Sequence, residues 1–103
     1  EVQITRVSPI DSTLSNPVIA DATVRAAQAV GLNLSTPILM GGSTDFGNVS
    51  RALPSTYFML DIGLPEGAAW HSKEVAAAAG GPSGHRAMLD AARVMALAVI
   101  EVR

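Results

Sequence analysis

The stretch Thr-Tyr-Phe-Met-Leu-Asp-Ile at residues 56–62 decides the fold that we predict for this chain. The run is nearly all apolar and has the length of one β-strand. Such a run predicts a strand buried on both faces, as in the middle of a parallel or mixed sheet with helices on each side. Residues 1–7 alternate and predict a second short strand, and residues 38–40 form another short apolar run.

Helices are predicted on both sides of these runs. Asn16 followed by Pro17 is typical of a helix start, and Gly31 suits the end of the same helix. Residues 45–51 predict a short helix. Residues 83–102 predict a long helix that is apolar around much of its circumference, so it is either deeply buried or packs against a missing partner. We therefore predict an α/β fold with a mixed sheet flanked by helices.

Composition narrows the classes of function. The net charge of -2 gives no case for nucleic acid or an anionic membrane as a partner. No apolar run approaches the roughly 20 residues of a membrane span, and the absence of cysteine fits a cytoplasmic protein. The hydrophobic content of 49% is high for 103 residues, and it predicts either a surface that contacts a neighbour or simply an alanine-rich helical protein.

A glycine-rich polar loop, Gly-Gly-Ser-Thr-Asp-Phe-Gly-Asn-Val-Ser, occupies residues 41–50. Glycines let the backbone approach a ligand closely, and the Ser, Thr, Asp and Asn side chains supply hydrogen-bonding groups. The loop is either one wall of a binding site or a connector rich in turn residues. It is not a P-loop, because no lysine precedes Lys73, and Ser43 lacks the closing glycine of a nucleophile elbow.

Five blocks of sequence follow one another at residues 41–50, 53–55, 62–63, 70–74 and 79–85. In this order they resemble zinc amidohydrolases of the aminoacylase and carboxypeptidase clan, and the aminobenzoyl-glutamate hydrolase-like branch is the most similar. The resemblance runs from about residue 2 to residue 102, over nearly the whole chain. It implies that this chain is the C-terminal portion of such an enzyme.

The resemblance implies a domain organisation and an activity. Residues 1–8 would end the connection from a lid domain as a strand, and residues 9–103 would be the C-terminal part of the catalytic domain. The enzyme would hydrolyse the amide bond of N-acyl amino acids or small peptides. It would use two divalent metal ions, zinc or else manganese or cobalt. Its partners would be the N-terminal remainder of the enzyme and a second subunit, held through the missing lid domain.

The same resemblance implies roles for single residues. His71 matches the last metal ligand of the family. Gly42, Ser43, Thr44 and, more weakly, Asn48 would lie next to the carboxylate of the substrate and contact it. The remaining ligands and the catalytic glutamate have no counterpart in this chain, so no catalytic residue is assigned within it.

Several points stay open on the residues alone. Asp45 is expected to cap the helix that follows it, but Asp45, Asp61 and Glu74 are all candidates to orient His71. His85 is expected to pack or hydrogen-bond near the start of the last helix. The alternative function is a non-catalytic α/β packing module, or a small α/β protein whose glycine loop binds a carboxylate-bearing metabolite.

Overall fold

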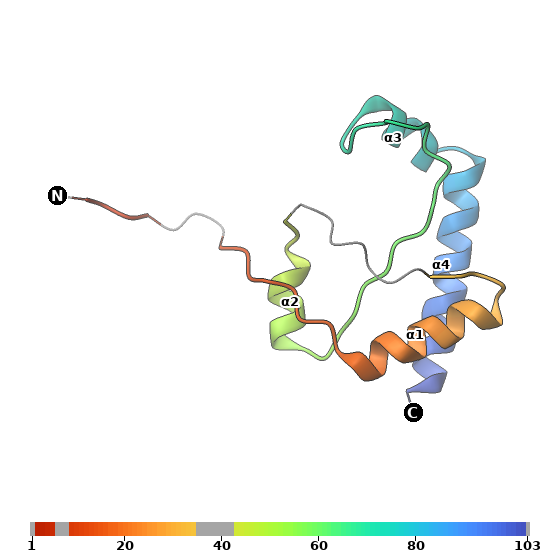
Figure 1. The fold of residues 1–103 in the computed structure, drawn as a ribbon, viewed down its shortest axis with the longest axis horizontal. Helices are drawn as coiled ribbons and strands as arrows, with labels where there is room; N and C mark the ends of the chain where they lie inside the picture. The colour runs from red at the N-terminus through yellow and green to blue at the C-terminus, as the bar shows by residue number, and fades with distance from the viewer. Residues whose placement is uncertain (1, 6–8, 35–42, 103) are drawn as a thin grey trace.

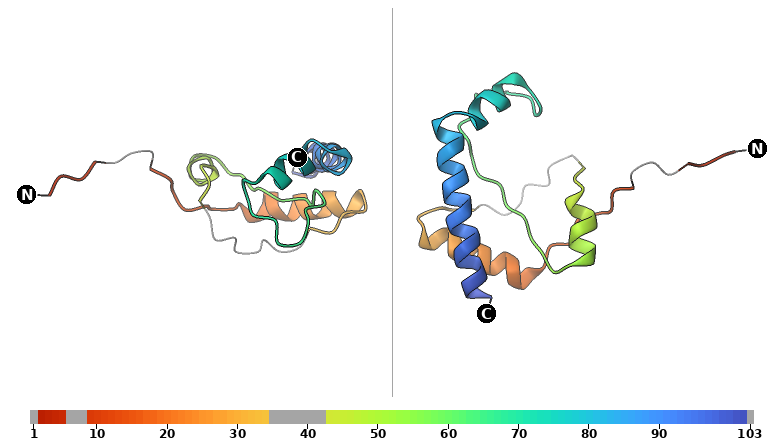
Figure 2. Two further views of the ribbon diagram at one scale, coloured as in Figure 1. Left: turned by 90° about the horizontal axis from the view of Figure 1, so that it is seen from above. Right: turned by 180° about the vertical axis from the view of Figure 1, so that it is seen from behind.

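The computed structural model describes residues 2–5, 9–34 and 43–102. These residues form four helices: α1 (Pro17–Ala29), α2 (Phe46–Ala52), α3 (Lys73–Ala79) and α4 (Pro82–Glu101). Figure 1 shows α1 crossing the C-terminal half of α4 and α3 at the opposite end of α4. Helix α2 lies on the left of this view, away from α4. The molecule is flat and elongated, 58 × 38 × 19 Å along its principal axes (Figure 2).

The predicted α/β fold with a mixed sheet is wrong, because the described residues contain helices and no strand. Residues 56–62 are extended, as the apolar run suggested, but no backbone hydrogen bond joins them to another described residue. A strand is defined by such pairing and not by extension alone. The side chains of Phe58 and Leu60 are half-buried, whereas those of Tyr57 and Met59 are exposed. Helices therefore cover one face of this segment, and the run is not buried on both.

The strand predicted for residues 1–8 is also absent from its described part. Residues 2–5 have no regular structure, and Val2 and Ile4 are almost fully exposed. Residues 6–8 and the apolar run at residues 38–40 lie outside the described residues. Alternation over so few residues, without a partner strand to pair with, does not make a sheet.

The helix predicted after Asn16 is confirmed. The Asn16 side-chain oxygen accepts hydrogen bonds from the backbone N–H groups of Val18 and Ile19, both at 3.1 Å. These two donors have no partner within the helix, so the cap satisfies them. Pro17 occupies the first turn, and Gly31 follows the helix with the positive φ of 80° that glycine adopts without strain.

Helix α1 packs against α4 through small side chains. Ala26 and Ala27 of α1 meet Val94 and Ala98 of α4, and all four are buried. Small residues let two helix backbones approach closely, so that many weak contacts add up. Val94 is the largest fully buried side chain in the described structure, which makes this a small core. Phe58 and the loop after α1 pack against its edge.

The long helix predicted for residues 83–102 is confirmed as α4. None of the helices among the described residues combines the length and the apolar character that crossing a membrane requires.

Gly84 sets the corner between α3 and α4, since a Cβ atom there would lie 2.2 Å from the carbonyl oxygen of Ala79.

Helix α2 contacts no other described helix and is held by the segment before α1. A Cβ atom on Gly47 would lie 1.8 Å from the backbone carbonyl oxygen of Asp11. Only glycine therefore permits this approach of α2 to residues 9–15.

We predict that Gly47→Ala lowers the free energy of unfolding by about 1–3 kcal/mol, the usual cost of forcing an extra methyl group into a filled space. Backbone atoms of the Asp11 segment would have to move to admit it. Gly80→Ala is the matched control, because its added Cβ comes no closer than 3.5 Å to its neighbours. Denaturant unfolding of both variants gives the comparison, and equal stabilities would contradict the close approach.

Candidate functional site

Ser43 and Thr44, two of the predicted substrate-binding residues, lie exposed immediately before α2. The hydroxyl oxygen of Thr44 accepts a hydrogen bond from the backbone N–H of Phe46 at 3.3 Å, and its carbonyl oxygen accepts from Gly47 N–H at 3.2 Å. Asp45, expected to cap this helix, makes no side-chain capping bond. Thr44 therefore stabilises the first turn in its place. Gly42 lies outside the described residues.

The side chain of Asn48 binds the chain's own backbone. Its carbonyl oxygen accepts a hydrogen bond from Asp11 N–H at 2.8 Å, and its amide nitrogen donates to the Pro9 carbonyl oxygen at 3.1 Å. The two bonds join residues almost 40 positions apart in the sequence. Binding of substrate by Asn48 stays a prediction, and it would compete with these bonds.

Ser50 and Arg51 of α2 also bind the segment before α1, a role that was not predicted from the sequence. Buried Ser50 donates from its hydroxyl to the Gly47 carbonyl oxygen at 2.8 Å and accepts from Leu14 N–H at 2.9 Å. The Arg51 guanidinium donates to the Ser12 carbonyl oxygen at 3.1 Å and also to the Ser12 hydroxyl. The one sign of this binding role in the sequence is that Gly47, Asn48, Ser50 and Arg51 lie within two turns of one short helix.

His71, the predicted metal ligand, lies in an exposed turn before α3 and has φ = 61°. It is the only non-glycine residue with positive φ in the described part of the chain. A left-handed conformation costs a residue with a Cβ atom roughly 1–2 kcal/mol, and such strained residues cluster at functional sites. Ser72 begins α3 directly after it, and its hydroxyl accepts a hydrogen bond from Val75 N–H at 3.3 Å.

The candidates for orienting His71 are engaged elsewhere or are not hydrogen-bonded to it. The Asp61 carboxylate accepts a hydrogen bond at 2.7 Å from Gly63 N–H, which closes a local turn. Hydrogen bonding to its own backbone amide, and then to Ser72, holds the pKa of Glu74 below its usual value, so this carboxylate is charged at neutral pH. No group of three or more His, Cys, Asp or Glu side chains within the described ranges is placed to hold a metal ion.

The helices that follow the two predicted parts of the site are not in contact. Helices α2 and α3 make no contact with each other in the described structure. Figure 1 shows α3 and the turn before it at the top of the molecule and α2 lower down and to the left. In a sheet, the carboxyl ends of neighbouring strands could have brought the two segments together, but the described residues contain no strand. His85 is exposed in the first turn of α4, where its backbone N–H donates to Gly81.

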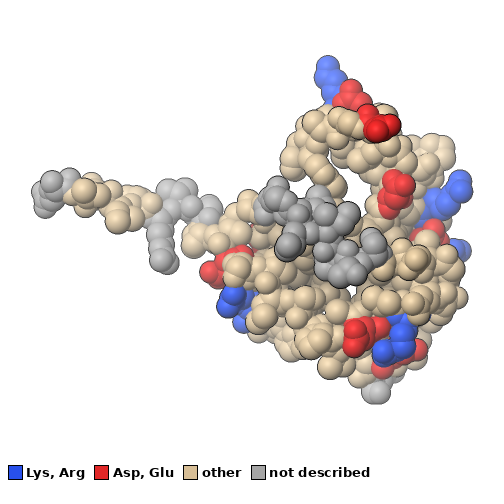
Figure 3. All heavy atoms as spheres, in the orientation of Figure 1, with Lys and Arg blue, Asp and Glu red and all other residues tan. Residues whose placement is uncertain are grey.

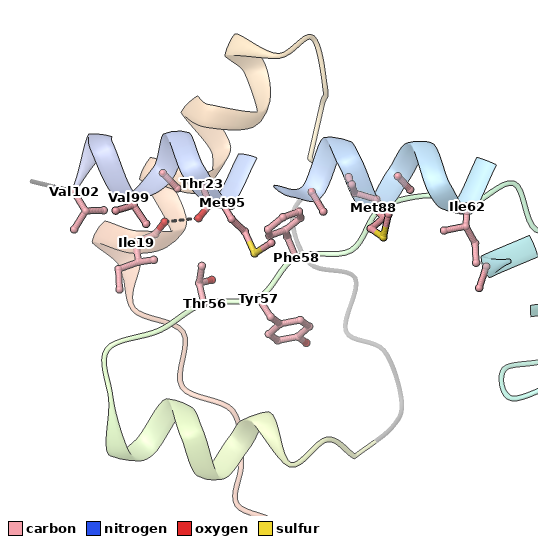
Figure 4. Close-up of a pocket in the computed structure, with 16 residues that line it drawn as sticks. Ile19, Thr23, Thr56, Tyr57, Phe58, Ile62, Met88, Met95, Val99 and Val102 are labelled. Atoms are coloured by element: carbon pink, nitrogen blue, oxygen red, sulfur yellow. Dashed lines mark hydrogen bonds between the residues drawn. The ribbon is translucent and has the colours of Figure 1, made fainter. Parts of the chain in front are cut away.

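Two hollows lie elsewhere on the described surface. A groove of about 970 Å³ runs between α1, α4 and the extended residues 56–62, and no charged residue is among those that line it (Figure 4). A smaller hollow of about 480 Å³ is more polar, and Asn33, Asp61, Arg86 and Asp90 are among its lining residues. On the face shown in Figure 3, the charged side chains of the described residues are scattered around the periphery.

Comparison of the chain with protein families, curated proteins and solved structures finds no match.

The backbone strain at His71 generates a prediction with a matched pair of variants. Glycine adopts positive φ freely, whereas alanine retains the Cβ atom that opposes it. His71→Gly and His71→Ala both remove the imidazole, so their difference reports the backbone alone. We expect the glycine variant to be more stable by about 1 kcal/mol, measured by thermal or denaturant unfolding. An alanine variant of equal or greater stability would show that the turn is not strained.

Proposed function

We propose that this chain is the C-terminal portion of a dinuclear metal amidohydrolase that hydrolyses N-acyl amino acids or small peptides. The observation that carries the proposal is the backbone of His71. A strained, exposed histidine lies at the one position where the chain resembles the last metal ligand of that family. Strain at a solvent-exposed residue contributes nothing to packing, and this favours a functional reason for it.

The residues present fit one ligand of such a site and no more. The His71 imidazole is exposed, so a nitrogen of its neutral form is accessible to a metal ion. The cap of α3 at Ser72 fixes the backbone next to it. A bound pair of zinc ions, or of manganese or cobalt, would polarise the scissile carbonyl and activate a water molecule. The other ligands and the proton-transferring glutamate would come from the N-terminal remainder of the enzyme.

Substrate contact is assigned to the segment before α2. The hydroxyl groups of Ser43 and Thr44 are exposed, and small hydroxyls can donate to a carboxylate without steric crowding. Gly42 is included by resemblance alone. Asn48 would take part only if the substrate replaced its bonds to residues 9–11. We place the enzyme in the cytoplasm, as a homodimer held through the lid domain of its N-terminal part.

A second candidate function, a non-catalytic module that binds a small metabolite, is favoured by the polar hollow. Its volume of about 480 Å³ is suited to a small molecule. The Arg86 guanidinium would bind a carboxylate, and Asp61 or Asp90 an ammonium group. Metal analysis of the native protein separates the two functions, because only the amidohydrolase needs bound metal.

The isolated 103-residue chain is predicted to show no amidase activity on N-acyl amino acids, even with added zinc or manganese. A dinuclear site needs several ligands and a bridging carboxylate, whereas the chain contains two histidines and no paired glutamates. The measurement is amide hydrolysis with and without a chelator. Turnover that depends on zinc and is lost on chelation would contradict the division of the site between two parts of the enzyme.

In the complete enzyme, His71→Ala is expected to lower kcat by several orders of magnitude, on the scale of losing a principal catalytic group. Metal content should fall as well, because one first ligand is gone. His85→Ala is the matched control, since it removes the other histidine and should change neither quantity. Near-normal turnover and metal content in His71→Ala would eliminate the assignment.

A further inference from the structure

The polar hollow of about 480 Å³ lies where the loop after α1, the extended segment and the first half of α4 meet. Packing contacts hold these walls in place. Leu32 and Leu34 of the loop pack against the α1–α4 core. Gly63, just after the extended segment, comes so close to α4 that an added Cβ atom would lie 3.4 Å from the Ser83 hydroxyl oxygen. The shape of the hollow is therefore set by the fold.

Apolar side chains line the hollow from the loop and from the extended segment. Three of the four are half-buried and the methionine is exposed: Leu32, Leu34, Met59 and Leu60. A wall of this kind favours an apolar group on the ligand, because contact with it removes apolar surface from water.

Charged groups of both signs line the same hollow. Arg86 and Asp90 lie four residues apart on α4 and therefore on one face of this helix. The Arg86 guanidinium takes part in neither of the two ion pairs among the described residues. Asp90 uses its Oδ1 atom for Arg93, which does not line the hollow. Asp61 uses its Oδ1 atom for the N–H of Gly63, so each carboxylate has a second oxygen to offer a ligand.

A free α-amino acid carries the groups that match this lining. A guanidinium binds a carboxylate through two parallel hydrogen bonds, and an ammonium group donates to carboxylate oxygens. A ligand with an anionic group alone would lie beside Asp61 and Asp90, and one with a cationic group alone would lie beside Arg86. Like charges at such short range disfavour both. A ligand with both charges close together gives each protein group a partner.

We propose that the polar hollow binds a free α-amino acid with an apolar side chain. Arg86 binds the α-carboxylate, Asp61 or Asp90 accepts hydrogen bonds from the α-ammonium group, and the apolar wall contacts the side chain. This inference rests on the second candidate function, metabolite binding at this hollow. It requires neither His71 nor a metal ion.

The test is an NMR titration of the protein with leucine in a metal-free buffer. Binding should shift the amide resonances of Gly63 and Ala87, which line the hollow. Leucine amide lacks the carboxylate and isocaproate lacks the ammonium group, so each should bind at least about tenfold more weakly, equivalent to about 1.4 kcal/mol. Glycine should also bind more weakly than leucine, because it has no side chain to contact the apolar wall.

Two variants locate the site. Arg86→Gln should weaken leucine binding by about tenfold or more, since the charge-assisted hydrogen bonds to the carboxylate are lost. Arg25→Gln is the control, because it removes the same charge from an arginine that does not line the hollow, and it should leave binding unchanged. Circular dichroism shows whether both variants keep their helices.

Equal binding of leucine by the two variants would overturn the proposal, because the hollow would then not be the site. Isocaproate or glycine binding as tightly as leucine would rule out an apolar amino acid as the ligand and leave metabolite binding standing. If none of these compounds bound, the amino-acid ligand would be eliminated. Amide hydrolysis is measured separately with metal present, so these results are distinguishable from failure of the proposed catalytic function.

Discussion

The close packing of α1 against α4 is the contact on which the rest of the structure depends. Ala26 and Ala27 allow it, because larger side chains would hold the two backbones apart, and Val94 fills the space that remains. The extended segment and the loop after α1 both pack against this pair. The exposed pair Arg25 and Glu101, 3.0 Å apart at the edge of the same contact, adds little, since exposed ion pairs are worth about 0–1 kcal/mol.

A second and polar attachment positions the predicted substrate segment. Gly47, Asn48, Ser50 and Arg51 bind residues 9–14 through backbone groups and not through a hydrophobic core. The T-shaped contact of Phe46 with Tyr57, with ring centres 5.1 Å apart, joins α2 to the extended segment. Asn48, which the sequence suggested as a ligand contact, thus has structural partners of its own. This supports the interpretation of the loop as a connector at Asn48.

Features that depend on residues close together in the sequence were predicted correctly, whereas the sheet, which depends on distant contacts, was not. The start of α1 was predictable, because Asn16 and Pro17 act on N–H groups within three residues. The sheet was not, because residues 56–62 have the same apolar sequence whether a strand or a helix covers them, and only distant contacts decide. For the candidate site, the exposure of His71 and its place before a helix agree with a loop histidine, but its positive φ has no signal in the sequence.

The core and the predicted site occupy different parts of the fold and are therefore separable. His71 lies beyond the corner that Gly84 sets between α3 and α4, whereas the α1–α4 core lies along α4 itself. The contact between α1 and α4 is small, since its largest fully buried member is one valine. A substitution at the turn of His71 therefore tests the chemistry proposed there without touching this contact.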